Sequence, residues 1–212
     1  MFLYEDDMTA LLLFLSLCWA DWTVINITDG ITVSQKTIPN SDLFAFRGEG
    51  VVDVHISKLQ SVLFDEKRGS EWVDLMEEAY PVTDWNVEKR IIYQKYDLPW
   101  PIQDRDYVMT QNRKINVDTK TITATYQSIE SKEKPQQECC IRAYAQRTYW
   151  KMEALPNGQT RVAVEVQTDP KGALPAWLIN MIQRDWPYNS ITRLTEQAQR
   201  ENIVPEATTT EW

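Results

Sequence analysis

The side chains that most often carry out chemistry in proteins are scarce in this 212-residue chain. His55 is the only histidine, so a serine–histidine–aspartate triad would have to use it, and zinc sites built from several histidines are excluded. The three cysteines, Cys18, Cys139 and Cys140, form no CxxC pair, which leaves metal and thioredoxin-like chemistry without support. The spacing of the six glycines allows neither a P-loop nor a GxGxxG turn. We therefore expect neither a metal nor a nucleotide cofactor.

Cys139 and Cys140 are neighbours in the sequence, and two states are open to them. Ordinary disulfides join Cα atoms roughly 4.4–6.8 Å apart, so adjacent cysteines can be bridged only through a strained ring. We favour two free thiols at the start of a strand over a disulfide.

The composition indicates burial of apolar material and disfavours polyanionic partners. Nine tryptophans and nine tyrosines are a large aromatic content for a chain of this size. The 22 basic and 31 acidic residues give a net charge of −9. An acidic surface repels phosphate backbones, so we expect no nucleic-acid partner. The same charge disfavours simple adsorption to an anionic membrane.

Residues 1–20 have features of a signal peptide. The apolar run at 11–18 is too short to span a membrane, which needs ~20 residues. Cys18 and Ala20 would occupy the minus-three and minus-one positions of a cleavage after Ala20. The acidic residues before the run are atypical, and a buried or peripheral helix is the alternative. The expected location is periplasmic or secreted, and the alternative location is cytoplasmic.

The remaining chain reads as one α+β domain over 21–203, followed by a flexible tail at 204–212. Alternating apolar residues predict strands that should pair as antiparallel hairpins in one curved sheet. After Asp169, an apolar stripe with helical period predicts one long C-terminal helix, which Pro187 should kink or interrupt. Strands are expected at 22–27, 31–36, 43–53, 87–97, 106–117, 121–129, 139–155 and 160–168, and short helices after His55 and at 70–78.

A curved sheet with an amphipathic helix across it encloses an elongated apolar space. Two interpretations follow from the pattern alone. The space is a closed core if the helix packs tightly on the sheet, and it is a ligand cavity if strand curvature holds the helix away. The aromatic excess and the proline within the helix favour a lined pocket with a movable cover.

Two motifs resemble the START (StAR-related lipid transfer) family. The turn Asp97-Leu98-Pro99-Trp100-Pro101, followed by Arg105-Asp106-Tyr107-Val108, is similar to an Arg-Asp-aromatic-Val element of that family. The run at 168–180 is similar to the family's DPxGxxPxWLxN junction between the last strand and the C-terminal helix. A weaker match is the strand that contains Trp150. Together the matches cover roughly 21–200.

The resemblance implies a helix-grip fold of the SRPBCC superfamily, in which a curved antiparallel sheet wraps around a long C-terminal helix. Such proteins hold one hydrophobic ligand, often a lipid or sterol, beneath that helix. Compact secreted bacterial members with a leading signal peptide share the DLPWP element.

This sequence departs from the family's sterol-binding pattern at one place. Sterol-binding members hold a charged pair in the cavity, with an arginine near the strand that follows the Arg-Asp element. Gln111 stands in that neighbourhood here, and the partner region around Tyr93 and Gln94 is uncharged. Arg113 shares a face with Gln111 only at a displaced height along the strand. Sterol recognition by such a pair is therefore not expected.

Each candidate ligand contact has a structural alternative. Arg47 is an internal counterion or an exterior residue, Arg105 a ligand contact or a loop anchor, and Trp100 part of the pocket mouth or a packed turn. The helical candidates recur at three- or four-residue spacing on a face that meets either the sheet or the ligand. The candidates are Arg47, Trp100, Arg105, Trp177, Met181, Arg184 and Tyr188.

The leading hypothesis is a monomeric, non-enzymatic carrier that binds and transfers a lipid or other hydrophobic ligand. The helix around Pro187 would act as its lid, with transient membrane contact. The alternative is an enzyme of the same superfamily, aromatase/cyclase-like or hydrolase-like, acting on a hydrophobic substrate. Candidate acid–base groups for it are Tyr93, Tyr144 and Glu165, whose spacing supports no particular mechanism.

Overall fold

A computed structural model describes residues 22–84 and 88–212. The predicted signal peptide at 1–20 lies outside these described residues. No helix within the two described ranges is long and apolar enough to cross a membrane. The elements are β1 (Thr23–Thr28), β2 (Ile31–Thr37), β3 (Phe44–Val52), α1 (Ile56–Leu63), the 3-10 helix η1 (Glu66–Glu71), β4 (Met76–Asp84), β5 (Lys89–Tyr96), β6 (Arg105–Asn116), β7 (Thr121–Ser128), β8 (Ile141–Arg142), β9 (Tyr144–Ala154), β10 (Thr160–Asp169), α2 (Ala176–Gln199) and the 3-10 helix η2 (Ala207–Thr209).

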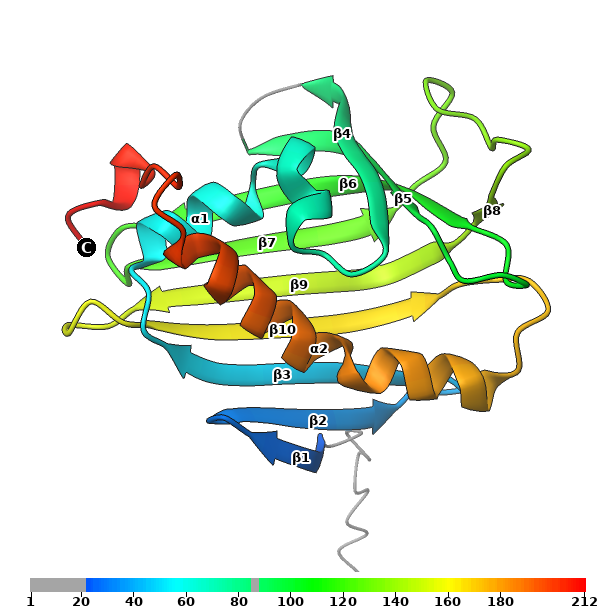
Figure 1. Cartoon of the computed structure of the whole chain (residues 1–212), viewed down its shortest axis with the longest axis horizontal. Coiled ribbons are helices and arrows are strands. Elements are labelled where there is room, and N and C mark those ends of the chain that lie inside the picture. The colour runs from blue at the N-terminus through cyan, green and yellow to red at the C-terminus, as the bar shows by residue number, and fades with distance from the viewer. Residues whose placement is uncertain (1–21, 85–87) are drawn as a thin grey trace, which may run out of the picture.

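The strands form one ten-stranded sheet in the order β1-β2-β3-β10-β9-β7-β6-β5-β4. The pairs along this path are antiparallel, while the short β8 pairs parallel with β6. Figure 1 shows α2 lying diagonally across one face of the sheet, with α1 beside its C-terminal end. This arrangement confirms the predicted α+β class, with an antiparallel sheet and one long C-terminal helix.

Local sequence patterns determine much of this sheet. Asp29 and Gly30 both have positive φ, at 51° and 76°, as the two-residue turn between antiparallel strands requires. Val162, Val164 and Val166 of β10 are buried while their neighbours are more exposed. Both features follow the predicted hairpin and the predicted alternation.

The predicted helix at 70–78 is wrong. Helix η1 ends at Glu71, and Met76 already begins strand β4. Trp72 and Met76 are buried, so their helix-like spacing reflects a turn that directs both inward. Among the strands that the structure describes, β4 is at the sheet edge and pairs with β5. Its register shifts near Pro81, which an edge strand tolerates.

The predicted flexible tail at 204–212 is also corrected by the structure. The backbone N–H of Glu206 donates to the Ser57 carbonyl at 3.1 Å. The Thr209 hydroxyl is buried and donates to Gln60 Oε1 at 2.8 Å. The last residues therefore pack on α1, because short polar side chains and backbone groups there find specific partners.

Cys139 and Cys140 form a disulfide, in contrast to the free thiols that we favoured. Cys140 is buried and Cys139 is exposed. The strand expected to begin at 139 begins at Ile141 instead, as the short β8.

Helix α2 runs through Pro187 without interruption, and Figure 1 shows it changing direction near its middle. Its buried residues gather in the second half, where Ile191 and Leu194 are fully covered. That half rests on β3 at Gly48, where an added Cβ would lie 2.9 Å from Pro187 Cβ and 3.2 Å from Ile191 Cδ1. The missing side chain of Gly48 therefore permits the close approach of helix and sheet.

We expect Gly48→Ala to lower the free energy of unfolding by ~1–3 kcal/mol, because the new methyl group overpacks the Pro187 contact. Chemical denaturation of the single variants and of the Gly48→Ala/Ile191→Val double variant, which removes the Ile191 Cδ1 atom 3.2 Å from the added Cβ, measures the coupling. The double variant should recover part of the loss. Strictly additive effects would show that the two residues do not meet in this way.

Candidate functional site

A cavity of about 500 Å³ lies between the first half of α2 and the sheet. Its floor comes from β5, β6, β7, β9 and β10, its roof from α2, and one wall from the segment between η1 and β4. A volume of this size falls within the ~300–1,000 Å³ typical of small-molecule pockets. Six aromatic side chains contribute to the lining: Trp72, Tyr96, Tyr107, Tyr126, Trp150 and Trp186.

The tryptophans connect the three sides of the cavity. Trp150 on the floor stands edge-to-face with Trp72 of the wall and with Trp186 of the roof, with ring centroids 6.4 Å apart in both pairs. Edge-to-face contacts hold aromatic rings in defined orientations. The cavity is thus lined by rings that the surrounding elements fix.

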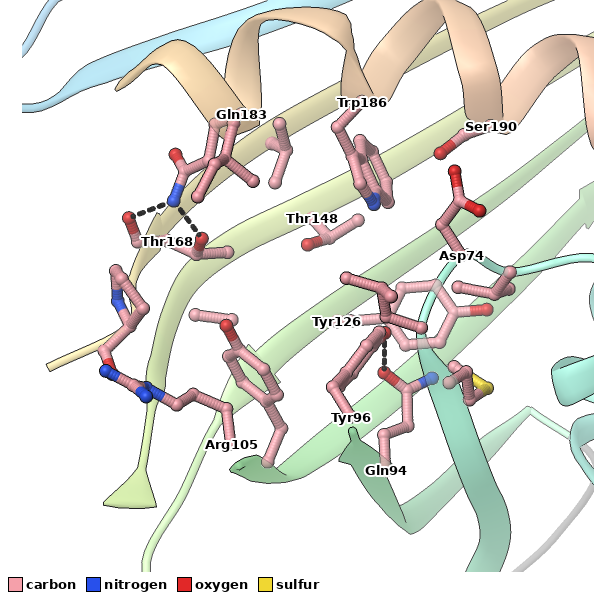
Figure 2. A pocket seen from close by; sticks show the side chains of 18 of the residues that line it. Asp74, Gln94, Tyr96, Arg105, Tyr126, Thr148, Thr168, Gln183, Trp186 and Ser190 are labelled. Atoms are coloured by element: carbon pink, nitrogen blue, oxygen red, sulfur yellow. Dashed lines mark hydrogen bonds between the residues drawn. The ribbon is translucent and has the colours of Figure 1, made fainter. Parts of the chain in front are cut away.

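The tyrosines of the cavity are held in the neutral form. Burial raises the pKa of Tyr107 to about 12, and it raises the pKa of Tyr96 and Tyr126 further. The Tyr96 hydroxyl donates to Gln94 Oε1 at 3.1 Å (Figure 2). These phenols can donate hydrogen bonds at neutral pH, but they are poor proton acceptors.

Arg105 lies at one end of the cavity and ties two loops together. Its Nε donates to the Pro170 carbonyl at 3.0 Å and its Nη2 to the Lys171 carbonyl at 3.1 Å. Its Nη1 donates to the Gln103 carbonyl. The side chain is only 3% exposed, and this burial lowers its pKa. Gly172 leaves room for the guanidinium, since an added Cβ there would lie 3.2 Å from Nη2.

Asp106, the other member of the motif pair, does not line the cavity. Its carboxylate is fully buried and accepts two hydrogen bonds from Arg142, at 2.8 and 3.1 Å. Because successive residues of a strand point to opposite faces, Arg105 and Asp106 serve separate anchors.

Polar contacts hold α2 at its edges. Asn180 accepts from the Phe44 backbone N–H at 2.9 Å and donates to the Asp42 carbonyl at 2.8 Å. Gln183 Nε2 donates to Thr168 Oγ1 at 2.9 Å (Figure 2). Asp74 and Arg193 form a 2.7 Å ion pair between the wall segment and α2.

Gln111 belongs to a buried polar cluster outside the cavity lining. Its Nε2 donates to Glu66 Oε1 at 2.8 Å and to the Tyr126 hydroxyl at 3.2 Å, while Arg90 Nε donates to its Oε1 at 2.6 Å. Burial raises the pKa of Glu66. Through the hydrogen bond from Gln111, the cluster fixes the hydroxyl of Tyr126, which lines the cavity.

The acid–base candidates from the sequence lie outside the cavity lining. Among the described residues, no group of three or more histidine, cysteine, aspartate or glutamate side chains is arranged to hold a metal ion. His55 caps α1, where its Nδ1 accepts from the Ser57 backbone N–H at 3.3 Å. Tyr93, Tyr144 and Glu165 lie outside the cavity lining.

Of the seven predicted ligand contacts, the structure places only Arg105 in the lining. Arg47 pairs with Glu49 at 2.7 Å, and Arg184 with Asp185 at 2.9 Å. The Tyr188 hydroxyl donates to Asp29 Oδ2 at 2.6 Å. These side chains are engaged at the surface and do not face the cavity.

The other three predicted contacts are exposed apolar residues. Trp100 is 93% exposed on the loop between β5 and β6, and Trp177 and Met181 are 68% and 51% exposed on α2. Helical spacing identifies residues that share a face, but it does not say which face meets the cavity.

The cavity-facing side of α2 carries Ile179, Gln183, Trp186 and Ser190, which are more polar than the predicted stripe. Their own three- and four-residue spacing is the signal that could have identified them. A choice of ligand contacts by hydrophobicity alone picks residues on the exposed face of α2, such as Trp177 and Met181. Trp72 and Thr148 were likewise missed as lining residues.

We expect Arg105→Met to lower the free energy of unfolding by ~2 kcal/mol or more, because buried carbonyls left unpaired cost about 1–3 kcal/mol each. Arg105→Lys should recover only part of this, since one ammonium group cannot reproduce the planar fork. Thermal and chemical denaturation measure both. Arg161→Met, which breaks an exposed pair with Glu153, is the control. An effect of Arg105→Met no larger than the control would contradict the anchoring role.

Comparisons with known proteins agree with this geometry. The chain is 26% identical over 187 residues to the phosphatidylcholine transfer protein of Mus musculus, covering 87% of this chain and 86% of the mouse protein. It is 25% identical over 180 residues to an uncharacterized protein of Pseudomonas aeruginosa, covering 85% and 88% of the two chains.

Solved structures show the same fold. Human STARD10 superposes with a TM-score of 0.78 at 18% identity, covering 87% of this chain and 76% of that chain. A STAR-related lipid transfer protein from Xanthomonas axonopodis superposes with a TM-score of 0.74 at 20% identity, covering 84% and 99%. The START domain pattern matches residues 10–196, most of the sequence. The resemblance is thereby confirmed, and the chain belongs to the START domain family.

Proposed function

We propose that this protein binds a lipid in the cavity beneath α2 and transfers it between membranes without a catalytic step. The observation that carries the proposal is the aromatic-lined cavity of about 500 Å³ in a START fold. Burial of a lipid chain gains ~0.8 kcal/mol per CH₂ group removed from water. The mouse relative, which matches 87% of this chain, is named a phosphatidylcholine transfer protein, and this name supports lipid transfer as the class of activity.

The enzymatic alternative has less support. Asp74 is the one carboxylate among the described lining residues, and Arg193 pairs with it at 2.7 Å. The lining tyrosines have raised pKa values, which disfavours a role as general base. The arrangement favours enclosure of a ligand over proton transfer.

Filling the cavity should abolish binding. We expect Ala145→Phe, which places a ring in the lining, to weaken uptake of a fluorescent acyl lipid at least ~10-fold while the fold remains. Ala163→Phe is the matched control, because Ala163 follows the buried Val162 and therefore points to the opposite face of the sheet. Fluorescence titration measures uptake, and circular dichroism checks folding. Equal uptake by Ala145→Phe and the unmodified protein would contradict binding in this cavity.

The exposed apolar residues next to the cavity are proposed to contact membranes during transfer. Trp177, Met181 and Ile182 lie on the first half of α2, and Ile182 also lines the cavity. Trp100 is on the loop that Figure 1 places at the same end of the sheet. Aromatic and long apolar side chains suit the interface between lipid and water. The net charge of −9 makes apolar insertion a better docking force than attraction to anionic lipids.

We expect Trp100→Ser/Trp177→Ser to slow transfer between phosphatidylcholine vesicles by ~5-fold or more, since each removed indole takes away apolar area that the membrane would bury. The affinity for lipid in solution should stay unchanged. Val117→Ser, which alters an exposed residue in the turn after β6, is the control. The measurement is energy-transfer dequenching between labelled vesicles. A transfer rate equal to that of the control would contradict this docking surface.

A further inference from the structure

We infer that the cavity selects lipids whose polar group is uncharged, such as an acylglycerol. The inference rests on the proposed lipid-binding function and specifies its ligand class. Its basis is the distribution of charge and of hydrogen-bonding groups around the cavity.

Both charged side chains among the described lining residues are already engaged. Asp74 Oδ1 lies 2.7 Å from Arg193 Nη2. Arg105 donates to three backbone carbonyls. Figure 2 shows its guanidinium turned toward the end of the pocket and away from its middle. A phosphate or carboxylate bound in the middle would therefore lack a counterion.

Uncharged polar groups do face the middle of the cavity. Figure 2 shows the Thr148 side chain of β9 beside the Trp186 indole of α2, with Ser190 farther along the helix, and all three residues line the cavity. Within residues 22–84 and 88–212, neither the Thr148 hydroxyl nor the Trp186 N–H has a protein hydrogen-bond partner. Thr148 can donate or accept, and Trp186 can only donate. An ester carbonyl or a hydroxyl group is complementary to this pair.

The energetic argument favours the uncharged headgroup. A charged group that leaves water without gaining a partner loses its hydration at a large free-energy cost. An ester or hydroxyl loses less hydration, and two hydrogen bonds in the cavity replace it. A lipid that leaves its headgroup in the solvent at the mouth would show no headgroup preference. A headgroup inside the cavity and a headgroup in the solvent therefore predict different orders of affinity among lipids that differ only in the headgroup.

The test compares three lipids that share one oleoyl chain: monooleoylglycerol, oleate and oleoyl-lysophosphatidylcholine. Each competes against a fluorescent acyl lipid on the whole protein, below its micelle concentration. We expect monooleoylglycerol to bind at least ~10-fold more tightly than the two charged lipids. Equal or tighter binding of oleate or of the lysophospholipid would overturn the inference while leaving lipid binding intact. Absence of binding by all three, and by the fluorescent lipid, would overturn the proposed function itself.

Variants test whether the Thr148 hydroxyl and the Trp186 N–H form hydrogen bonds with the lipid headgroup. Thr148→Val removes the hydroxyl at nearly constant shape, and Trp186→Phe removes the indole N–H with a smaller aromatic ring. We expect the double variant to weaken monooleoylglycerol binding ~5-fold or more. Oleate binding should change by less than twofold under the same conditions. Thr125→Val is the matched control, because Thr125 points to the face of β7 opposite the lining residue Tyr126. Unchanged monooleoylglycerol affinity in a folded double variant would overturn the assignment.

Discussion

The close contact between Pro187 and Gly48 is the constraint on which the cavity depends. It brings the second half of α2 directly onto β3, where Ile191 and Leu194 complete the core. The helix, which contains Pro187, changes direction near its middle (Figure 1), and the cavity lies between its first half and the sheet. One helix therefore closes the core with its second half and roofs a cavity with its first half.

Hydrogen bonds at the rim keep the first half of α2 in place without filling the space beneath it. Asn180 and Gln183 bind groups on the two flanking loops and strands, and Arg105 fixes the segment that leads into the helix. The Asn180 and Gln183 hydrogen bonds are only partly buried, so each contributes less than the fully buried apolar contacts of Ile191 and Leu194 in the second half. The first half of the helix is thus the part best suited to move when a ligand enters or leaves.

Most of the sheet and the family could be predicted from the sequence, but the residues that line the cavity could not. The Asp29-Gly30 turn and the alternating valines of β10 are encoded locally, so they were predicted. β4 was missed because an edge strand with a proline carries little alternation of its own. The ligand-facing side of α2 was misjudged because Gln183 and Ser190, which face the cavity, are polar, whereas Trp177 and Met181, which face outward, are apolar. The rotation of the helix depends on tertiary contacts such as the packing at Gly48, which the helical sequence alone does not show.

Native mass spectrometry of the intact protein, followed by extraction and identification of any bound molecule, tests the central claim most directly. The account predicts a stoichiometric complex with one lipid that remains through purification, and loss of that complex in Ala145→Phe. A protein that stays ligand-free after purification and after incubation with acylglycerols and phospholipids would contradict it.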